Sequence, residues 1–234
     1  MEREEAVNRA LSLMREHRAA YIVTPNPEIV MSAWDDPALM TALRNADMVL
    51  PDGIGVVKAA QLMGTPLKAK LPGIDIATAV IEKMSQENSS VYLFGAKPGV
   101  AEKAGEELKR RFPDLEVCGT HDGYFKDDEP IIADINEKKP DFLLVCLGSP
   151  KQETWMAKNA PRLDIGIMAG LGGTLDVFAG TVKRAPAVWQ RLGLEWLYRC
   201  IKEPWRFKRI SKLPRFLFKA LGCRIRKIFN GKKG

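Results

Sequence analysis

One carboxylate in this chain stands where a general base would be needed. Asp52 lies in the run Leu50-Pro51-Asp52-Gly53, directly after an expected strand over residues 47–50. A general base takes a proton from a substrate hydroxyl within hydrogen-bond reach. A Pro-Asp-Gly turn explains the same three residues without any chemistry. Asp52 becomes a candidate through its position, because ligands of open α/β sheets bind outside the carboxyl ends of the strands.

Two further polar segments also follow expected strands. Thr24 and Asn26 come after the apolar run 20–23, and Gln152 comes after the run 141–147. Thr and Asn are good helix caps, so the first segment taken alone is better explained as a turn and cap. The segment Gly148-Ser149-Pro150-Lys151-Gln152-Glu153 suits a sugar or phosphate contact and an ordinary helix start with Pro equally well. We expect Asn26, Asp52 and Gln152 to share one edge of the sheet.

A glycine-rich run follows the expected strand over residues 164–168. Gly172 and Gly173 would let a ligand approach the backbone, and the next helix, expected over residues 174–178, contains Asp176. Close packing of helix on strand explains the same glycines. The spacing is not the dinucleotide fingerprint, and no phosphate-binding GxxxxGK[ST] loop occurs, which argues against an ATPase, a GTPase, a dehydrogenase or a methyltransferase.

The remaining titratable residues give weaker signals. Asp75 is expected in the first turn of a helix, and His121 in a surface loop. The four cysteines are far apart with no CxxC pair, and there are only two histidines, so no zinc site is expected. The sequence therefore predicts neither a metal nor another cofactor.

The elements that must position these residues follow a repeated pattern. Short apolar runs end in Gly, Pro, Asn or Asp, and helical patterns come next. This order indicates parallel βαβ units, and therefore a Rossmann-like, mostly parallel sheet with helices on both faces. The run 142–147 is apolar throughout, as a central parallel strand should be. Strands are expected over residues 20–23, 47–50, 91–94, 115–118, 141–147 and 164–168, with a loop at Gly119-Thr120 after the fourth.

The charge of the chain changes sharply at Lys183. Residues 183–234 contain 16 Lys and Arg and two acids, whereas residues 1–182 contain 20 basic and 27 acidic residues, so their formal charges are +14 and −7. The basic part also holds three of the five tryptophans. We therefore expect an α/β core over 1–182 and a basic helical C-terminal appendage over 183–234. An anionic membrane surface or a nucleic acid fits such an appendage.

Three arginines of this appendage recur at helix-like intervals. Arg199, Arg206 and Arg209 would share a broad face if helix continues past Pro204. Guanidinium groups bind diphosphate bidentately, which lysine cannot do. A solvated helix face is the plainer explanation, but the scarcity of acids and the interleaved aromatic residues weigh against it. No apolar run approaches the roughly 20 residues that span a bilayer, so contact with a membrane would be peripheral.

Six motifs in fixed order are more specific together than any is alone. They are Thr24-Pro25-Asn26-Pro27-Glu28, Leu50-Pro51-Asp52-Gly53-Ile54-Gly55, Gly148-Ser149-Pro150-Lys151-Gln152-Glu153, Arg184-Ala185-Pro186, Leu192-Gly193-Leu194-Glu195-Trp196-Leu197-Tyr198-Arg199 and Lys202-Glu203-Pro204-Trp205-Arg206. In order and spacing they closely resemble the WecG/TagA/CpsF glycosyltransferases, glycosyltransferase family 26, over nearly the whole chain. The nearest resemblance is to the TagA-type N-acetylmannosaminyltransferases.

This resemblance implies an inverting, metal-independent hexosyltransferase at the cytoplasmic face of the cell membrane. It would move N-acetylmannosamine or a related hexose from a UDP-sugar to polyprenyl-diphosphate-linked N-acetylglucosamine. The product would enter teichoic acid or another surface polysaccharide. Apolar edges of such enzymes often pair, so a homo-oligomer is a further expectation. A nucleic-acid-binding α/β protein is the alternative, although it leaves the predicted Asp, Asn and Gln cluster unexplained.

The resemblance also assigns roles to individual residues. Asp52 matches the proposed general base. The other assignments are an acceptor pocket at Thr24, Asn26 and Gln152, a nucleotide region at Gly172, Gly173 and Asp176, and a closing appendage with Arg199, Arg206 and Arg209. Two features depart from the family: Lys70 stands where Arg is frequent, and the chain opens almost directly in an expected helix over residues 2–17. A further hypothesis is that the appendage docks on anionic lipid and completes the site there.

Overall fold

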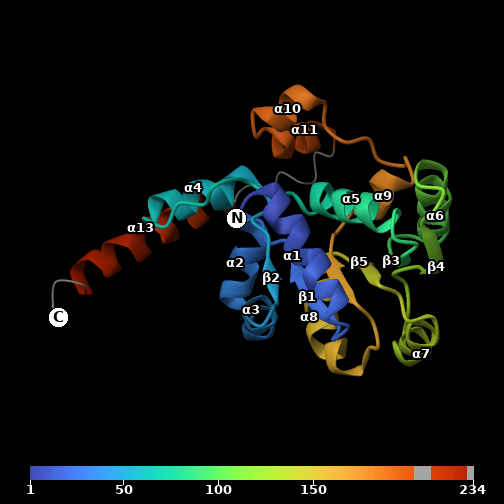
Figure 1. The fold of residues 1–234 in the computed structure, drawn as a ribbon. Coiled ribbons are helices and arrows are strands. Elements are labelled where there is room, and N and C mark those ends of the chain that lie inside the picture. Colours follow the sequence, from blue (N-terminus) through green and yellow to red (C-terminus); the bar gives the residue numbers. More distant parts are fainter. Residues whose placement is uncertain (203–211, 231–234) are drawn as a thin grey trace.

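The protein is built around a six-stranded sheet in which every pair of neighbouring strands is parallel (Figure 1). The computed structural model describes residues 1–202 and 212–230. The strands follow the order β2-β1-β6-β5-β3-β4, so the first strand, β1, pairs with the last strand, β6, near the middle of the sheet. They are β1 (Ala20–Val23), β2 (Met48–Val49), β3 (Ser90–Gly95), β4 (Glu116–His121), β5 (Phe142–Cys146) and β6 (Ile167–Gly170).

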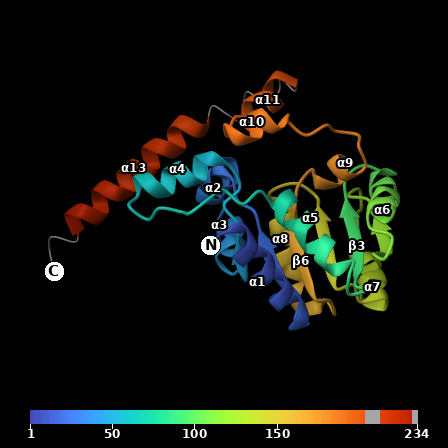
Figure 2. The ribbon, with the colours of Figure 1, turned by 45° about the horizontal axis from the view of Figure 1, so that its top comes forward.

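Helices cover both faces of this sheet and make a three-layered α/β body (Figure 2). One face packs against α1 (Arg3–Arg15), α5 (Gly73–Met84) and α6 (Val100–Arg111). The other face packs against α3 (Pro37–Arg44), α7 (Glu129–Lys138) and α8 (Lys151–Asn159). The remaining helices are α2 (Pro27–Asp35), α4 (Ile54–Leu62), η1 (Ala160–Arg162), α9 (Thr174–Phe178), α10 (Ala187–Arg191), α11 (Glu195–Lys202) and α13 (Lys212–Asn230). The predicted fold class is confirmed.

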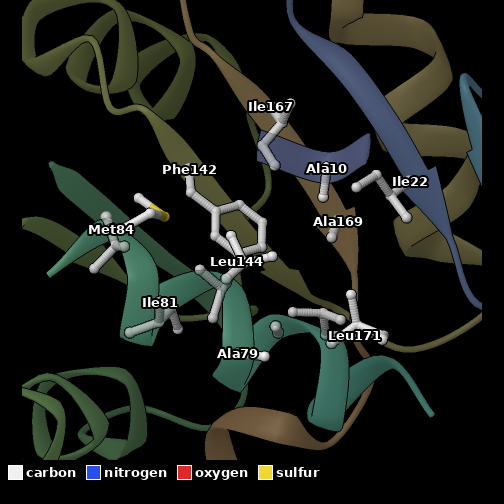
Figure 3. Close-up of a cluster of buried hydrophobic side chains, with 14 of the residues drawn as sticks. Ala10, Ile22, Ala79, Ile81, Met84, Phe142, Leu144, Ile167, Ala169 and Leu171 are labelled. Carbon is white, nitrogen blue, oxygen red and sulfur yellow. The ribbon is translucent and has the colours of Figure 1, made fainter. Parts of the chain in front are cut away.

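The central strands are buried on both sides, which explains their apolar sequences. All five residues of β5 are buried, and its side chains alternate between the two helical layers. Figure 3 shows Phe142 and Leu144 of β5 against Ile81 and Met84 of α5. Each buried side chain of this size contributes about 1.5–3 kcal/mol relative to exposure. This continuous core fixes the positions of the loops at the strand ends.

Two expected boundaries are wrong. Gly119 and Thr120 do not form a loop, because β4 runs on to His121 and pairs with β3 to its end. Gly119 is needed for packing: a Cβ atom there would lie 2.4 Å from the ring of Tyr92. The last strand starts at Ile167, three residues later than expected, because only from there does it pair with β1 and β5.

The C-terminal helices leave the body in two directions. Helices α10 and α11 lie beside the carboxyl-terminal edge of the sheet, and α13 lies along α4 and projects away from the body (Figure 2). A small cluster joins α13 to α2 and α4: Phe216 and Ala220 pack against Met31 and Ala59. Nζ of Lys219 also lies 4.1 Å from the ring centroid of Trp34, a cation–π contact.

Candidate active site

Asp52 lies at the carboxyl end of the sheet, where three loops meet. Its backbone N–H donates to the Pro25 carbonyl at 3.1 Å, which ties it to the loop after β1. The carbonyl of Pro51 accepts from the N–H of Leu71 at 2.8 Å, which brings in the loop before α5. Gly53 then begins α4 at a φ of 97°, a conformation that favours glycine. The half-buried Asp52 therefore lies in a turn whose backbone is tied to two neighbouring loops, and its role as a general base stays a prediction.

Thr24 and Asn26 both have roles in the fold. The Thr24 hydroxyl donates to the Gly170 carbonyl at 2.8 Å and so links the ends of β1 and β6. The Asn26 Oδ1 accepts from the N–H groups of Glu28 and Ile29 and caps α2. The structural explanation of this segment thus holds, and a contact of either residue with substrate stays a prediction.

The buried side chain of Gln152 supports the glycine-rich loop through a hydrogen bond to its backbone. Its side chain is only 2% exposed; Oε1 accepts from the Gly172 N–H at 3.0 Å, and Nε2 donates to Glu153 Oε1 at 2.9 Å. A Cβ atom on Gly170 would lie 3.0 Å from Nε2, so a side chain at this position would press on the Gln152 amide. Thr24 and Gln152 therefore meet through Gly170. Direct contact of Gln152 with substrate stays a prediction.

Glu153 is a buried acid that sequence reasoning did not single out. It is 1% exposed, and burial raises the pKa of its carboxyl group. Its Oε2 has no hydrogen-bond partner among the residues that the structure describes. The only sequence signal was its place in the motif at 148–153. Its bond to Gln152 makes it part of the support under the loop rather than an exposed acid.

A cleft of about 650 Å³ opens at the carboxyl ends of β3 and β5. After β3 the chain turns to α6 on one face, and after β5 it turns to α8 on the other. Loops that diverge in this way form the crevice in which open α/β sheets bind ligands. The lining residues are Ala96, Lys97, Gly123, Tyr124, Phe125, Lys126, Cys146, Leu147, Lys151 and Asp176.

The cleft combines positive charge with exposed aromatic surface. Lys97, Lys126 and Lys151 line it, and Tyr124 is 69% exposed. Lys151 is fixed in place: Nζ donates to the Gly123 carbonyl at 2.9 Å and lies 3.9 Å from the centroid of the Phe125 ring. Such a surface suits an anionic ligand that carries a flat ring. The run 123–126 was missed from the sequence because its residues are typical of any surface loop.

The glycine-rich loop connects β6 to α9, the helix whose Asp176 lines the cleft. Gly172 has a φ of 55°, and no atom lies within 4 Å of where its Cβ would stand, so a ligand has room to approach the backbone. Asp176 lies in the first turn of α9 and lines the cleft. Burial raises the pKa of the Cys146 thiol to about 12, which favours the protonated thiol over the nucleophilic thiolate. Asp176 thus borders the cleft, whereas Gly172 and Gly173 are not among its lining residues, and the binding roles of all three stay predictions.

Asp52 and the cleft lie at the same edge of the sheet but are separate. Asp52 follows β2, and the strand order puts three strand spacings, or about 14 Å, between β2 and β5. The glycine-rich loop after β6 lies between them. An elongated ligand in the cleft would therefore pass this loop to reach Asp52.

The other predicted residues have clear places. Asp75 is in the first turn of α5, as expected. His121 ends β4 with its ring edge-on to Phe94, at 5.9 Å between centroids, so the expectation of a surface loop is wrong. Arg199 belongs to α11, whereas Arg206 and Arg209 lie outside the described residues.

The pattern of the glycosyl transferase WecG/TagA/CpsF family matches residues 1–229. The chain belongs to this family. The proteins to which the chain is similar include several named N-acetylglucosaminyldiphosphoundecaprenol N-acetyl-beta-D-mannosaminyltransferase. The one from Bacillus spizizenii is 39% identical over 202 residues, which cover 86% of this chain and 79% of that protein. Those from Staphylococcus aureus MW2 and Bacillus subtilis 168 are each 35% identical, over 85% and 86% of this chain and 78% and 79% of theirs.

Membership of the WecG/TagA/CpsF family confirms two predictions: the resemblance itself and the assignment as a glycosyltransferase. In the described part of the chain, no helix is long and apolar enough to cross a membrane. Within residues 1–202 and 212–230, no three His, Cys, Asp or Glu residues come together as a metal site. The mechanism without a metal stays a prediction.

Proposed function

We propose that this family member transfers N-acetylmannosamine, or a related hexose, from a UDP-sugar to polyprenyl-diphosphate-linked N-acetylglucosamine. The product would serve teichoic acid or another surface polysaccharide. The observation that carries the proposal is the shared edge: a rigidly held Asp52 and a lysine-lined cleft lie about three strands apart in a chain of this family. The names of the relatives support the same sugar and the same acceptor.

The donor would lie in the cleft with its diphosphate directed along the glycine-rich loop. Lysines at 97, 126 and 151 supply positive charge for the phosphates, and Tyr124 offers a ring for the base. The carboxylate of Asp176 is suited to accept hydrogen bonds from ribose hydroxyls. The open space beside the Cα of Gly172 leaves the approach to β6 and β1 clear.

The chemical step would be a single displacement with inversion. Asp52 takes the proton of the acceptor hydroxyl while its oxygen attacks the anomeric carbon of the donor sugar. The bond from that carbon to the diphosphate breaks, and UDP leaves with the electron pair. Fixed cations stabilise the negative charge that develops on the leaving group, which is the largest electrostatic demand of the reaction. Arg199, Arg206 and Arg209 would meet this demand.

The C-terminal appendage over residues 183–234 would bring the enzyme to its lipid-linked acceptor. Helix α13 packs one side on α2 and α4, while Phe218 stays 74% exposed and Leu221 is also exposed. Arg215 and Arg224 are exposed on the same helix. Apolar and basic side chains on one surface helix are typical of peripheral binding to anionic lipid. We therefore infer that the enzyme binds peripherally to the cytoplasmic face of the cell membrane.

A donor screen tests the proposal directly. UDP-sugars are mixed with the full chain and a short-chain lipid-diphosphate N-acetylglucosamine, and products are read by mass spectrometry. Addition of one N-acetylhexosamine from UDP-N-acetylmannosamine, with UDP raising the unfolding temperature, is the expected result. If no product forms with any UDP-sugar, and the chain binds random oligonucleotides in a salt-dependent way, the nucleic-acid alternative is favoured instead.

A further inference from the structure

Arg184 forms a half-buried ionic link between the body and the start of the C-terminal segment. Its side chain is 22% exposed. Nη1 and Nη2 donate to the two carboxylate oxygens of Asp75, the second at 3.0 Å. Its buried Nε lies 3.5 Å from Oε1 of Glu195, in the first turn of α11. One guanidinium thus connects the first turn of α5 with the first turn of α11.

A second set of contacts runs beside this link and involves α10. Nζ of Lys70 donates to the Gln190 carbonyl at 2.7 Å, and Nε2 of Gln190 donates to the Ala185 carbonyl at 2.6 Å. The turn between α10 and α11 fits closely on α4, because a Cβ at Gly193 would lie 3.2 Å from Ile54. Ile54 is two residues beyond Asp52. Helix α11 is therefore seated next to the loop that carries Asp52.

We propose that Arg184 is a positioning residue that seats α10 and α11 against the edge of the sheet and thereby places α11 beside Asp52. This inference rests on the proposed function, in which α11 carries Arg199 toward the leaving diphosphate. Arg184 itself touches no reacting atom. It acts through the orientation of the helix that follows it.

The chemistry of the link explains why arginine is needed at this position. The planar guanidinium donates to both oxygens of Asp75 and still presents Nε to Glu195, whereas a lysine ammonium cannot hold both carboxylates in fixed directions. The hydrogen bonds to Asp75 raise the pKa of Arg184, so the link keeps its charge at any working pH. Because the pair with Asp75 is bidentate and partly buried, removal of one partner should cost more than the loss of an exposed ion pair.

The same set of contacts gives a structural role to Lys70, which stands where the family frequently has arginine. Lys70 satisfies a carbonyl at the end of α10, where a cation is favourable. A single ammonium is sufficient for a single carbonyl, so this contact does not need arginine. Arg184 and Lys70 hold α10 from its two ends.

Hydrogen exchange and kinetics together test the proposal on the full chain. Arg184→Gln, Asp75→Asn, the double variant and Arg184→Lys are compared with wild type. Arg18→Gln is the matched control, because it removes an ion pair to Asp47 at the opposite edge of the sheet. The amides of residues 187–202 should exchange at least about 10-fold faster in Arg184→Gln, and kcat/KM for the lipid acceptor should fall about 10- to 100-fold. Arg184→Lys should be intermediate, and the double variant no worse than Arg184→Gln.

Binding of UDP separates this role from general damage to the fold. The UDP-induced rise in unfolding temperature should stay at the wild-type value in Arg184→Gln, because the cleft lies at β3 and β5. Unchanged exchange over 187–202 would overturn the link whatever the activity. Faster exchange with normal kcat/KM would overturn the positioning role. A wild-type chain without transferase activity would overturn the proposed function and the positioning role together.

Discussion

The α/β body and the C-terminal segment are held in place by different interactions. Two large apolar clusters run through the sheet and fix every strand end. The C-terminal segment attaches through the Arg184 and Lys70 contacts at α10–α11 and through a small cluster around Phe216 at α13. The floor of the site therefore rests directly on the core, whereas the described part of the C-terminal segment is held by smaller, local sets of contacts. This difference underlies the proposal that the body binds the donor and the C-terminal segment completes the site.

Asp52→Asn should have the largest effect. The amide cannot accept the acceptor's proton, so kcat should fall about 10²- to 10⁴-fold. The affinity for UDP, measured by calorimetry, should not change, because Asp52 does not line the cleft. Asp35→Asn, at the exposed end of α2, is the control and should behave as wild type. Near-normal turnover would remove Asp52 as the base.

A chain that ends at Pro186 tests the division between body and appendage. It should remain folded by circular dichroism and bind UDP, since both apolar clusters and the cleft lie before Lys183. Transferase activity should fall by about 10²-fold or more through loss of the arginines. Sedimentation with anionic vesicles should also be lost. If full activity persists with a lipid-linked acceptor, the appendage has no catalytic role.

Lys97→Gln tests the part of the comparison that concerns the α/β body, namely donor binding in the cleft. This exposed lysine should contribute modestly to phosphate binding, so the Kd for UDP should rise about 3- to 10-fold at low salt and less at high salt. Lys103→Gln, on the exposed side of α6, should leave the Kd unchanged. Equal Kd values for UDP in both variants would contradict the prediction that the nucleotide binds in this cleft.

Two phenylalanines on α13 separate docking on the body from docking on lipid. Phe216→Ala removes a side chain that is 8% exposed and should free α13 from α4, at a local cost of about 3 kcal/mol or less. Phe218→Ala removes a 74% exposed side chain, so it should leave that packing intact and weaken vesicle binding several-fold. Hydrogen exchange of α13 and vesicle sedimentation report the two effects. Identical behaviour of the variants would contradict the assignment of the two faces.

Glu153→Gln should give the smallest effect, a change in stability with pH. Because its pKa is raised in the fold, the native state holds this proton more tightly than the unfolded chain. Stability from this group is present at low pH and is lost as the pH rises from the model-peptide value of 4.5 through the higher native value. The variant should therefore unfold a few degrees above wild type at pH 7.5 and close to it at pH 4. Glu137→Gln, an exposed control, should show no such crossover, and parallel curves for Glu153→Gln would refute the effect.

Much of the fold could be predicted because local patterns and tertiary packing agree. The apolar run at β5 and the glycine at the start of α4 specify a buried strand and a turn on their own. Prediction was wrong where pairing decided the outcome, as at β4, whose end is set by its partner β3. It also missed Lys97 and Tyr124, since exposed loop residues carry no periodic signal and converge only when β3 and β4 lie together.

By itself, the sequence determined the α/β class, the family, the sharp change of charge at Lys183 and the candidacy of Asp52. These follow from residue type and spacing, which act over short distances along the chain. Only the tertiary structure decided that Gln152 is a buried brace, that the cleft opens between β3 and β5, and that Arg184 joins Asp75 to Glu195. Arg184 and Asp75 are 109 positions apart in the chain, and the packing of the sheet and its helices determines that they meet.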